Sequence, residues 1–157
     1  MKLDYTKRYL DVIHELAQGI QPYPQRVVEQ FDALPRATFL PDDLAEAFGD
    51  RILNDEGYAG LLSQPSIIFC ILVALSLKGP ERVFEGGTGT GYQTALLARL
   101  ATHVYTVERD LARLEEAQAR LESLGITNVT FIHGDAAYGL PQEAPFDRMI
   151  FGAAIHG

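Results

Sequence analysis

The sequence predicts an α/β fold, in which a helical region is followed by a parallel β-sheet, and three observations carry this prediction. Before residue 81, apolar residues recur at the spacing of helices and no strand alternation appears. From residue 81 onward, short β-rich runs alternate with helical stretches. No repeat or low-complexity linker divides the 157 residues. We therefore expect one domain over residues 1–157, with a helical part at 1–80 and a sheet part at 81–157.

The helical part contains four predicted helices. Gly19 and Pro35 stop the first two, because glycine and proline are common helix terminators. Pro65 opens the fourth helix, which is apolar almost throughout and is expected to be buried. Residues 54–63 lack periodicity and contain two glycines, so they are expected to form a loop. The predicted helices span residues 6–18, 25–34, 42–48 and 66–77.

The second part alternates strands and helices. Strands connected through helices run parallel, because the crossover returns the chain to the same end of the sheet. The predicted strands span residues 82–85, 103–107, 129–132 and 148–151, and the predicted helices span 92–100 and 111–124.

Charge and composition narrow the possible partners. The net charge of −8 disfavours a general nucleic-acid or anionic-membrane surface. The one cysteine, Cys70, allows no internal disulfide and is expected to be a buried thiol. The four histidines share no ligand spacing, so no metal site is expected. The polar N-terminus and the lack of a membrane span predict a cytoplasmic protein.

A glycine loop follows the first predicted strand. The strand ends in Glu85, and Gly87, Gly89 and Gly91 then lead into a helix. Residues without a Cβ atom let the backbone approach a nucleoside-containing ligand, and the helix N-terminus adds N–H donors. Tyr92 stands in place of the third glycine of a dinucleotide fingerprint, and the loop has no lysine of a phosphate-binding P-loop. The sequence therefore disfavours both a dinucleotide-binding site and a phosphate-binding P-loop.

Two further strands also end in carboxylates. Glu108 follows the second strand, where it can accept hydrogen bonds from both ribose hydroxyls, and Asp135 follows the third, within reach of an adenine amino group. An acidic edge repels a pyrophosphate but suits a cationic sulfonium ligand without phosphate, which favours S-adenosylmethionine over NAD. The alternative is that the glycines only form a tight turn and the carboxylates are solvated strand ends.

Several stretches of the chain agree in order and spacing with one known family: Arg36-Ala37-Thr38-Phe39-Leu40-Pro41, Ser63-Gln64-Pro65, Val83 to Gln93, Val104 to Arg109, Gly134-Asp135 and Ala144 to Asp147. On these stretches the chain resembles the protein-L-isoaspartate O-methyltransferases from about Arg36 to Ala154. This resemblance implies a Rossmann-like S-adenosylmethionine-dependent methyltransferase fold with the strand order 3-2-1-4. It also implies that the methyl donor is bound by Glu85, Gly87, Thr88, Gly89, Gly91, Tyr92, Glu108, Arg109, Asp135 and Ala136.

The resemblance also implies that Ser63 is the catalytic residue. A substrate carboxylate is already a nucleophile, so a hydroxyl needs only to align it with the methyl group. The activity implied is methylation of the α-carboxyl group of L-isoaspartyl residues in damaged proteins, a repair reaction. The alternative for Ser63 is a helix N-cap ahead of Pro65, and the two roles can coexist.

The chain departs from the family pattern at several places. Leu61 replaces a threonine, and the acidic pair Asp55 and Glu56 would disfavour an acidic substrate. Gly86 replaces an apolar residue, with an expected loss of packing. The chain also stops after the fourth strand, so the fold is expected to be C-terminally incomplete, with an exposed sheet edge that a homo-oligomer could cover. Two alternatives therefore stay open: a donor-binding module without isoaspartyl activity, and a methyltransferase for another acceptor.

Overall fold

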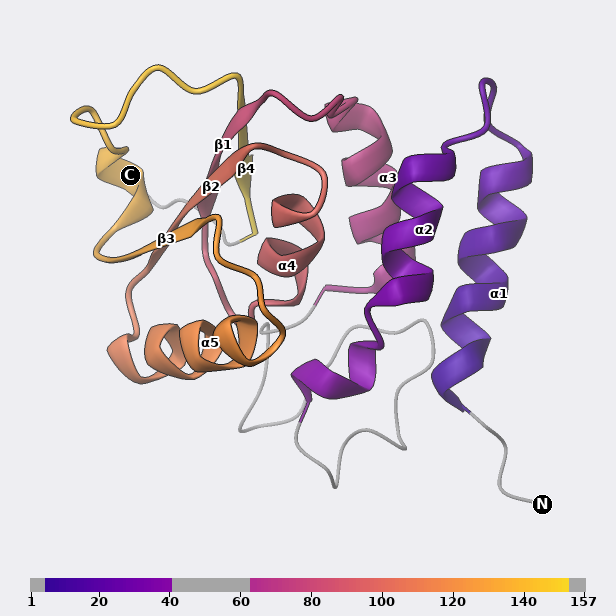
Figure 1. Cartoon of the computed structure of the whole chain (residues 1–157), viewed down its shortest axis with the longest axis horizontal. Helices are drawn as coiled ribbons and strands as arrows, with labels where there is room; N and C mark the ends of the chain where they lie inside the picture. The colour runs from indigo at the N-terminus through magenta and orange to yellow at the C-terminus, as the bar shows by residue number, and fades with distance from the viewer. Residues whose placement is uncertain (1–4, 41–62, 153–157) are drawn as a thin grey trace. The chain divides into compact units, whose positions relative to one another are not determined.

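The computed structural model describes residues 5–40 and 63–152 and divides the chain into two compact units. The first unit spans Met1–Ser76 and the second spans Leu77–Gly157, so the division lies close to the predicted change from helices to sheet at residue 80. Each unit is described by itself (Figure 1). No helix in the described ranges has the length and apolar character needed to cross a membrane.

The first unit is helical, as its sequence periodicity predicts. Among its described residues, three α-helices form at the expected places, and a 3₁₀ turn that is not predicted from the sequence follows α2. The proline at the start of α3 occupies a position where its missing N–H costs nothing. The predicted helix at 42–48 and nearly all of the predicted loop at 54–63 lie outside the described residues. The elements are α1 (Tyr5–Gln18), α2 (Gln25–Ala33), η1 (Arg36–Phe39) and α3 (Pro65–Leu75).

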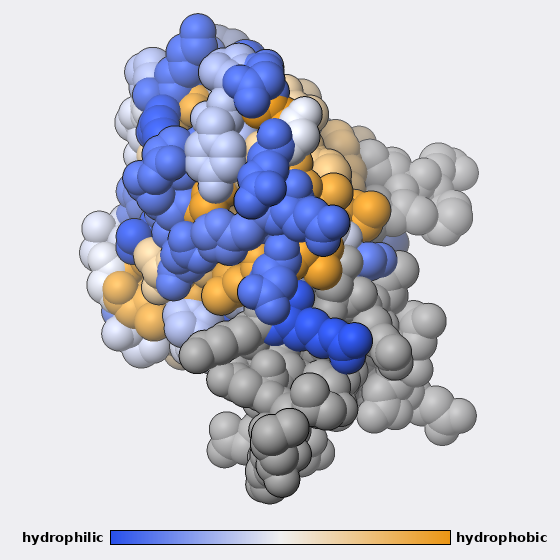
Figure 2. Space-filling model, turned by 90° about the vertical axis from the view of Figure 1, so that its right-hand side faces the viewer, coloured by the Kyte–Doolittle hydropathy of each residue, from blue (hydrophilic) through white to orange (hydrophobic). Residues whose placement is uncertain are grey.

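An apolar core holds the helices of this unit together. The rings of Phe31 on α2 and Phe69 on α3 meet edge to face with their centroids 5.9 Å apart. Ile13 on α1 is fully buried, while Asp11 and Glu15 of the same helix are exposed. The view from the side of α1 accordingly shows mostly hydrophilic residues with smaller apolar areas between them (Figure 2). This one-sided burial is what the helical spacing of apolar residues requires.

The prediction of a buried α3 is wrong in part. Cys70 is exposed, although the sequence places it in an apolar run and predicts a buried thiol. Ile67 lies one helical turn earlier and is half exposed, whereas Ile68, Phe69 and Leu72 are buried. A helix that is apolar on all sides gives no periodic signal for its outer face, so the sequence pattern could not identify which residues face outward.

The second unit is a four-stranded parallel sheet with helices between the strands. The strand order is β3-β2-β1-β4, which confirms the predicted order and the Rossmann-like fold. Each element lies within a few residues of its predicted bounds. The elements are β1 (Arg82–Gly86), α4 (Tyr92–Ala98), β2 (His103–Glu108), α5 (Leu111–Ser123), β3 (Val129–His133), η2 (Ala136–Tyr138) and β4 (Arg148–Phe151).

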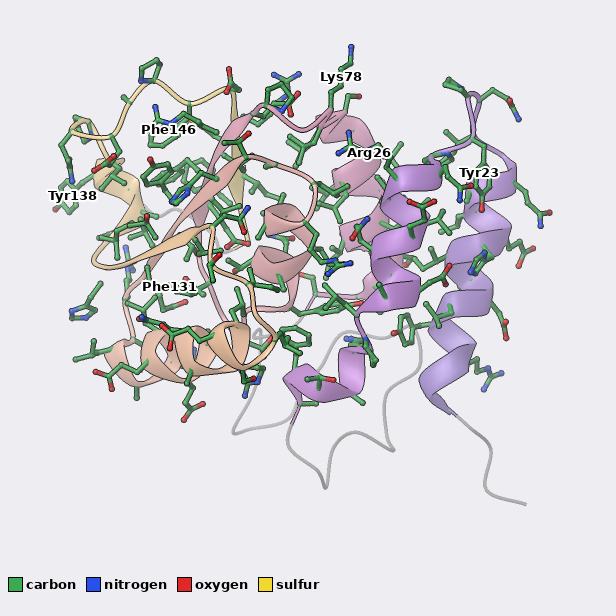
Figure 3. All side chains as sticks on the ribbon, in the orientation of Figure 1. Tyr23, Arg26, Lys78, Phe131, Tyr138 and Phe146 are labelled. Carbon is green, nitrogen blue, oxygen red and sulfur yellow. The ribbon has the colours of Figure 1, made fainter. Side chains whose placement is uncertain are left out.

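The two faces of this sheet are covered differently. Helix α4 packs on β2, and α5 packs on β2 and β3. On the face that bears Phe84 and Val107, the segment between β3 and β4 supplies Leu140 and the ring of Phe146 (Figure 3). The Phe146 centroid lies 5.4 Å from that of Phe84. The sheet is therefore fixed from both sides, which holds the carboxyl ends of its strands in a defined arrangement.

Strand β4 forms an apolar edge of the sheet. Among the described residues it pairs only with β1, and Met149 and Phe151 are 51% and 39% exposed. These exposures agree with the expected apolar edge. Covering of that edge by a second copy of the chain stays a prediction.

The packing loss expected at Gly86 does not occur, because Phe151 fills the space. A Cβ atom at position 86 would lie 2.5 Å from Cδ1 of Phe151 and 2.8 Å from Cβ of Ala136, closer than atoms can approach. We therefore expect Gly86→Val to destabilise the protein by about 2 kcal/mol through overpacking. Urea unfolding of the unsubstituted protein, Gly86→Val, Phe151→Ala and the double variant measures this. The loss of stability caused by Gly86→Val should be smaller in the Phe151→Ala background, where only the close approach to Ala136 remains. An equal loss in both backgrounds would contradict it.

Candidate functional site

The glycine loop joins β1 to α4 and is held by backbone hydrogen bonds at both ends. The N–H of Gly87 donates to the carbonyl of Val107 on β2 at 2.8 Å, and the N–H of Gly91 closes a turn onto the carbonyl of Thr88 at 3.0 Å. Gly91 has φ +84°, and a Cβ there would lie 2.7 Å from Cδ1 of Leu121 on α5. Only glycine meets both the conformational and the packing requirement at this position.

Beneath the loop lies a buried carboxylate, that of Glu85 at the end of β1. It has no exposed surface, and it accepts hydrogen bonds from the Gln93 amide at 3.0 Å and from the Thr94 and Thr106 hydroxyls at 2.5 and 2.8 Å. Burial raises the pKa of Glu85, and these three hydrogen bonds oppose that rise. The carboxylate therefore links β1, α4 and β2 directly behind the loop.

Glu108 at the end of β2 holds the loop from its exposed side. One carboxylate oxygen accepts the N–H of Gly89 at 3.1 Å, and the other accepts the N–H groups of Arg109 and Asp110 at 2.9 and 3.1 Å. A carboxylate has about four acceptor positions, so these three bonds leave capacity on the oxygen that faces Gly89. The side chain is partly exposed and can accept a further donor from a ligand.

The third strand end carries a charged pair. Asp135 caps the short helix η2 by accepting the N–H of Ala137 at 2.9 Å, and its other oxygen pairs with the guanidinium of Arg109. These two contacts, the backbone bond first, hold the pKa of Asp135 below its usual value, so its carboxyl group is ionised at neutral pH. Arg109 and Asp135 thus bridge the ends of β2 and β3.

The structure sorts the residues predicted at the donor into two groups. Glu85, Thr88, Gly91 and Tyr92 are buried, and the side chains of Glu85 and Thr88 make hydrogen bonds that support the loop. Contact of these four residues with the donor stays a prediction. The residues that reach the surface along the carboxyl edge of the sheet are Gly87, Gly89, Glu108, Arg109, Asp135 and Ala136. Tyr138 on η2 is 84% exposed and projects outward (Figure 3).

Three residues that support the glycine loop are not among the site residues predicted from the sequence. Thr106 bonds to both Glu85 and Thr88, the latter at 2.7 Å between the two hydroxyl oxygens. Its signal is a polar side chain in an apolar strand, two residues before Glu108. Thr94 is the second, and its hydroxyl donates to the carboxylate of Glu85 at 2.5 Å. Arg120 is the third, and it donates to the carbonyl of Thr90 at 2.8 Å.

Ser63 lies in the first unit, two residues before the start of α3. The N-cap of α3 is Gln64, whose carbonyl accepts the N–H groups of Ile67 and Ile68, so Ser63 is not the N-cap residue that the alternative interpretation predicts. Ser63 is partly exposed. Its carbonyl accepts a hydrogen bond from the guanidinium of Arg36 at 3.3 Å. Asp55, Glu56 and Leu61 lie outside the described residues.

Comparison with known proteins agrees with this geometry. The family model of protein-L-isoaspartate(D-aspartate) O-methyltransferase matches residues 7–157. The chain is 44% identical over 132 residues to the protein-L-isoaspartate O-methyltransferase of Dictyoglomus thermophilum, covering 84% of this chain and 60% of the relative. It is 48% identical over 132 residues to that of Anaeromyxobacter dehalogenans, covering 83% of this chain and 63% of the relative.

A solved structure of a protein-L-isoaspartate O-methyltransferase superposes on 93% of this chain with a TM-score of 0.75 and 28% sequence identity, and 47% of that structure is covered. The chain spans about 60% of the length of the curated relatives it matches. The match runs through the helical unit, the glycine loop and all four strands. The chain belongs to the protein-L-isoaspartate(D-aspartate) O-methyltransferase family.

Proposed function

We propose that the protein transfers a methyl group from S-adenosylmethionine to the α-carboxyl group of L-isoaspartyl residues in damaged proteins, as a step of protein repair in the cytoplasm. The observation that carries the proposal is the carboxyl edge of the sheet, where the glycine loop, Glu108 and Asp135 come together. Membership of the family supplies the reaction class.

The residues present at this edge fit S-adenosylmethionine. Two carboxylates stand there with one arginine, and the described loop has no lysine, so the edge suits a ligand with cationic groups and no phosphate. Glu108 keeps one acceptor position for a ribose hydroxyl, and the ionised Asp135 can accept a hydrogen bond from an adenine amino group. When bound, S-adenosylmethionine supplies an electrophilic methyl group. Gly87 and Gly89 offer no side chain to obstruct its approach.

On the acceptor side we assign Ser63 the task of orienting the isoaspartyl carboxylate. The acceptor carboxylate needs no general base, because it is ionised at neutral pH and attacks as it stands. A hydroxyl group can donate one hydrogen bond to it and leave the other oxygen to attack. The Ser63 hydroxyl makes no hydrogen bond to another residue in the described ranges, so it can take this role.

Replacement of Ser63 by alanine tests the proposal. We expect transfer of radiolabelled methyl groups to an isoaspartyl peptide to fall by about 10- to 100-fold, because alignment of the reacting groups is lost. The dissociation constant for S-adenosylmethionine, measured by calorimetry, should stay within about twofold. Ser76→Ala at the other end of α3 is the matched control, since its hydroxyl bonds only locally to the carbonyl of Val73.

The same assay separates the alternatives. Transfer to the isoaspartyl peptide but not to its aspartyl counterpart supports the repair assignment. Donor binding without transfer to any carboxyl acceptor would instead identify a donor-binding module. Transfer to a different acceptor class would contradict the substrate assignment and leave the donor assignment in place.

A further inference from the structure

Arg36 is a charged side chain buried in the helical unit, and its surroundings point to a role in the reaction. It begins η1, the short helical turn after α2, and only 2% of its surface is exposed. Its backbone N–H donates to the hydroxyl of Tyr9 on α1 at 3.2 Å. Its guanidinium donates to the carbonyl of Ser63 at 3.3 Å. Arg36 therefore connects α1, η1 and the segment that leads into α3.

Arginine is an uncommon choice for a purely structural position of this kind. Removing a guanidinium from water carries a large desolvation cost unless hydrogen bonds compensate for it. A backbone carbonyl is a strong acceptor, and the planar guanidinium fixes the direction of the bond as well as its length. The bond to Ser63 therefore restrains where this one residue lies, at the position to which the proposed function assigns the acceptor hydroxyl.

We infer that Arg36 is a positioning residue for Ser63. This inference rests on the proposed function of Ser63. The Arg36 guanidinium holds the Ser63 backbone so that the hydroxyl meets the acceptor carboxylate in one orientation. Burial keeps Arg36 from contacting a substrate itself. Pro65 restricts the backbone of Gln64, the residue that follows Ser63. A displacement of about 1 Å at a reacting group can reduce a rate by about 100-fold.

A double-mutant cycle between Arg36 and Ser63 tests this inference. Arg36→Lys keeps the charge but loses the fork and reach of the guanidinium. In the full chain we expect kcat for the isoaspartyl peptide to fall by about 10- to 100-fold, with the KM for S-adenosylmethionine within about twofold. In the Ser63→Ala background the same substitution should change kcat by less than about threefold, because no hydroxyl remains to be misplaced.

Tyr9→Phe is the matched control, because it removes the hydrogen bond to the Arg36 backbone and leaves the guanidinium bond in place. We expect it to lower stability while kcat stays within about twofold. Equal losses from Arg36→Lys in both backgrounds would overturn the inference, since Arg36 would then act independently of Ser63. A loss in Tyr9→Phe as large as in Arg36→Lys would also overturn it and indicate a general packing role.

Hydrogen–deuterium exchange keeps the inference separate from the proposed function. If the unsubstituted protein transfers no methyl group to the isoaspartyl peptide, the proposed function fails, and exchange in the peptide spanning residues 63–68 still tests Arg36. Faster exchange there in Arg36→Lys than in Tyr9→Phe supports the restraint on Ser63. Equal exchange in the two variants would overturn it.

Discussion

Replacement of Glu108 by alanine is expected to weaken the binding of S-adenosylmethionine by about 10- to 100-fold. A hydrogen bond to a charged acceptor contributes about 1.5–3 kcal/mol, and the ribose would lose the one acceptor position that Glu108 keeps open. The variant also frees the N–H of Gly89, which Glu108 holds at 3.1 Å, so the loop loses one of its restraints. Isothermal titration calorimetry measures the change.

The matched control for this prediction is Glu115→Ala, which removes the same charge from an exposed position on α5. Its donor affinity should equal that of the unsubstituted protein within about twofold, since exposed charges contribute little. Glu108→Gln should fall between the two, because an amide oxygen accepts hydrogen bonds without the charge. An unchanged dissociation constant in a folded Glu108→Ala protein would place the ribose elsewhere.

Replacement of Glu85 by alanine is expected to cost about 3 kcal/mol of stability and most of the donor binding. The substitution leaves Gln93, Thr94 and Thr106 without their buried acceptor. Loss of a buried hydrogen-bond network is among the substitutions that lower the free energy of unfolding most. Chemical denaturation monitored by circular dichroism measures the loss of stability. Thr130→Ala, which removes a partly buried hydroxyl bonded to His103 on the opposite side of the sheet, is a control expected to cost much less.

The raised pKa of Glu85 also predicts a pH dependence. Because the folded state holds the proton more tightly than the unfolded chain, the stability from this group is complete below the ordinary carboxyl pKa of 4.5 and is lost as the pH rises through the folded pKa. Glu85→Gln carries no such proton, so its stability relative to the unsubstituted protein should increase with pH over this window. If the free energy of unfolding of Glu85→Gln minus that of the unsubstituted protein stays constant or decreases as the pH rises, the raised pKa of Glu85 is contradicted.

Much of the fold could be predicted from the sequence, because its signals are local. Glycine and proline mark the ends of α1, α2 and α3, and the apolar periodicity places the helices and strands within a few residues. The outer face of α3 could not be predicted, because its apolar residues continue around the helix and leave Cys70 without a distinguishing pattern.

The site could be predicted less completely than the fold. The carboxyl ends of parallel strands meet at one edge, so Glu108 and Asp135 could be placed there from their positions after β2 and β3. The burial of Glu85 depends on hydroxyls from α4 and β2, up to 21 residues away along the chain. Likewise, Arg120 bonds to Thr90, which lies 30 residues away along the chain, and no local sequence pattern predicts such a contact.

The restraints on the glycine loop have a thermodynamic consequence for ligand binding. Val107 and Glu108 on β2 and Arg120 on α5 already fix the loop backbone, while Glu85 fastens the strand and helix on either side of it. Ordering a flexible backbone would cost about 1–2 kcal/mol for each residue at the moment of association. Here that entropy is lost when the protein folds, so the interaction energy of the donor is available for affinity and not for assembling its own binding site.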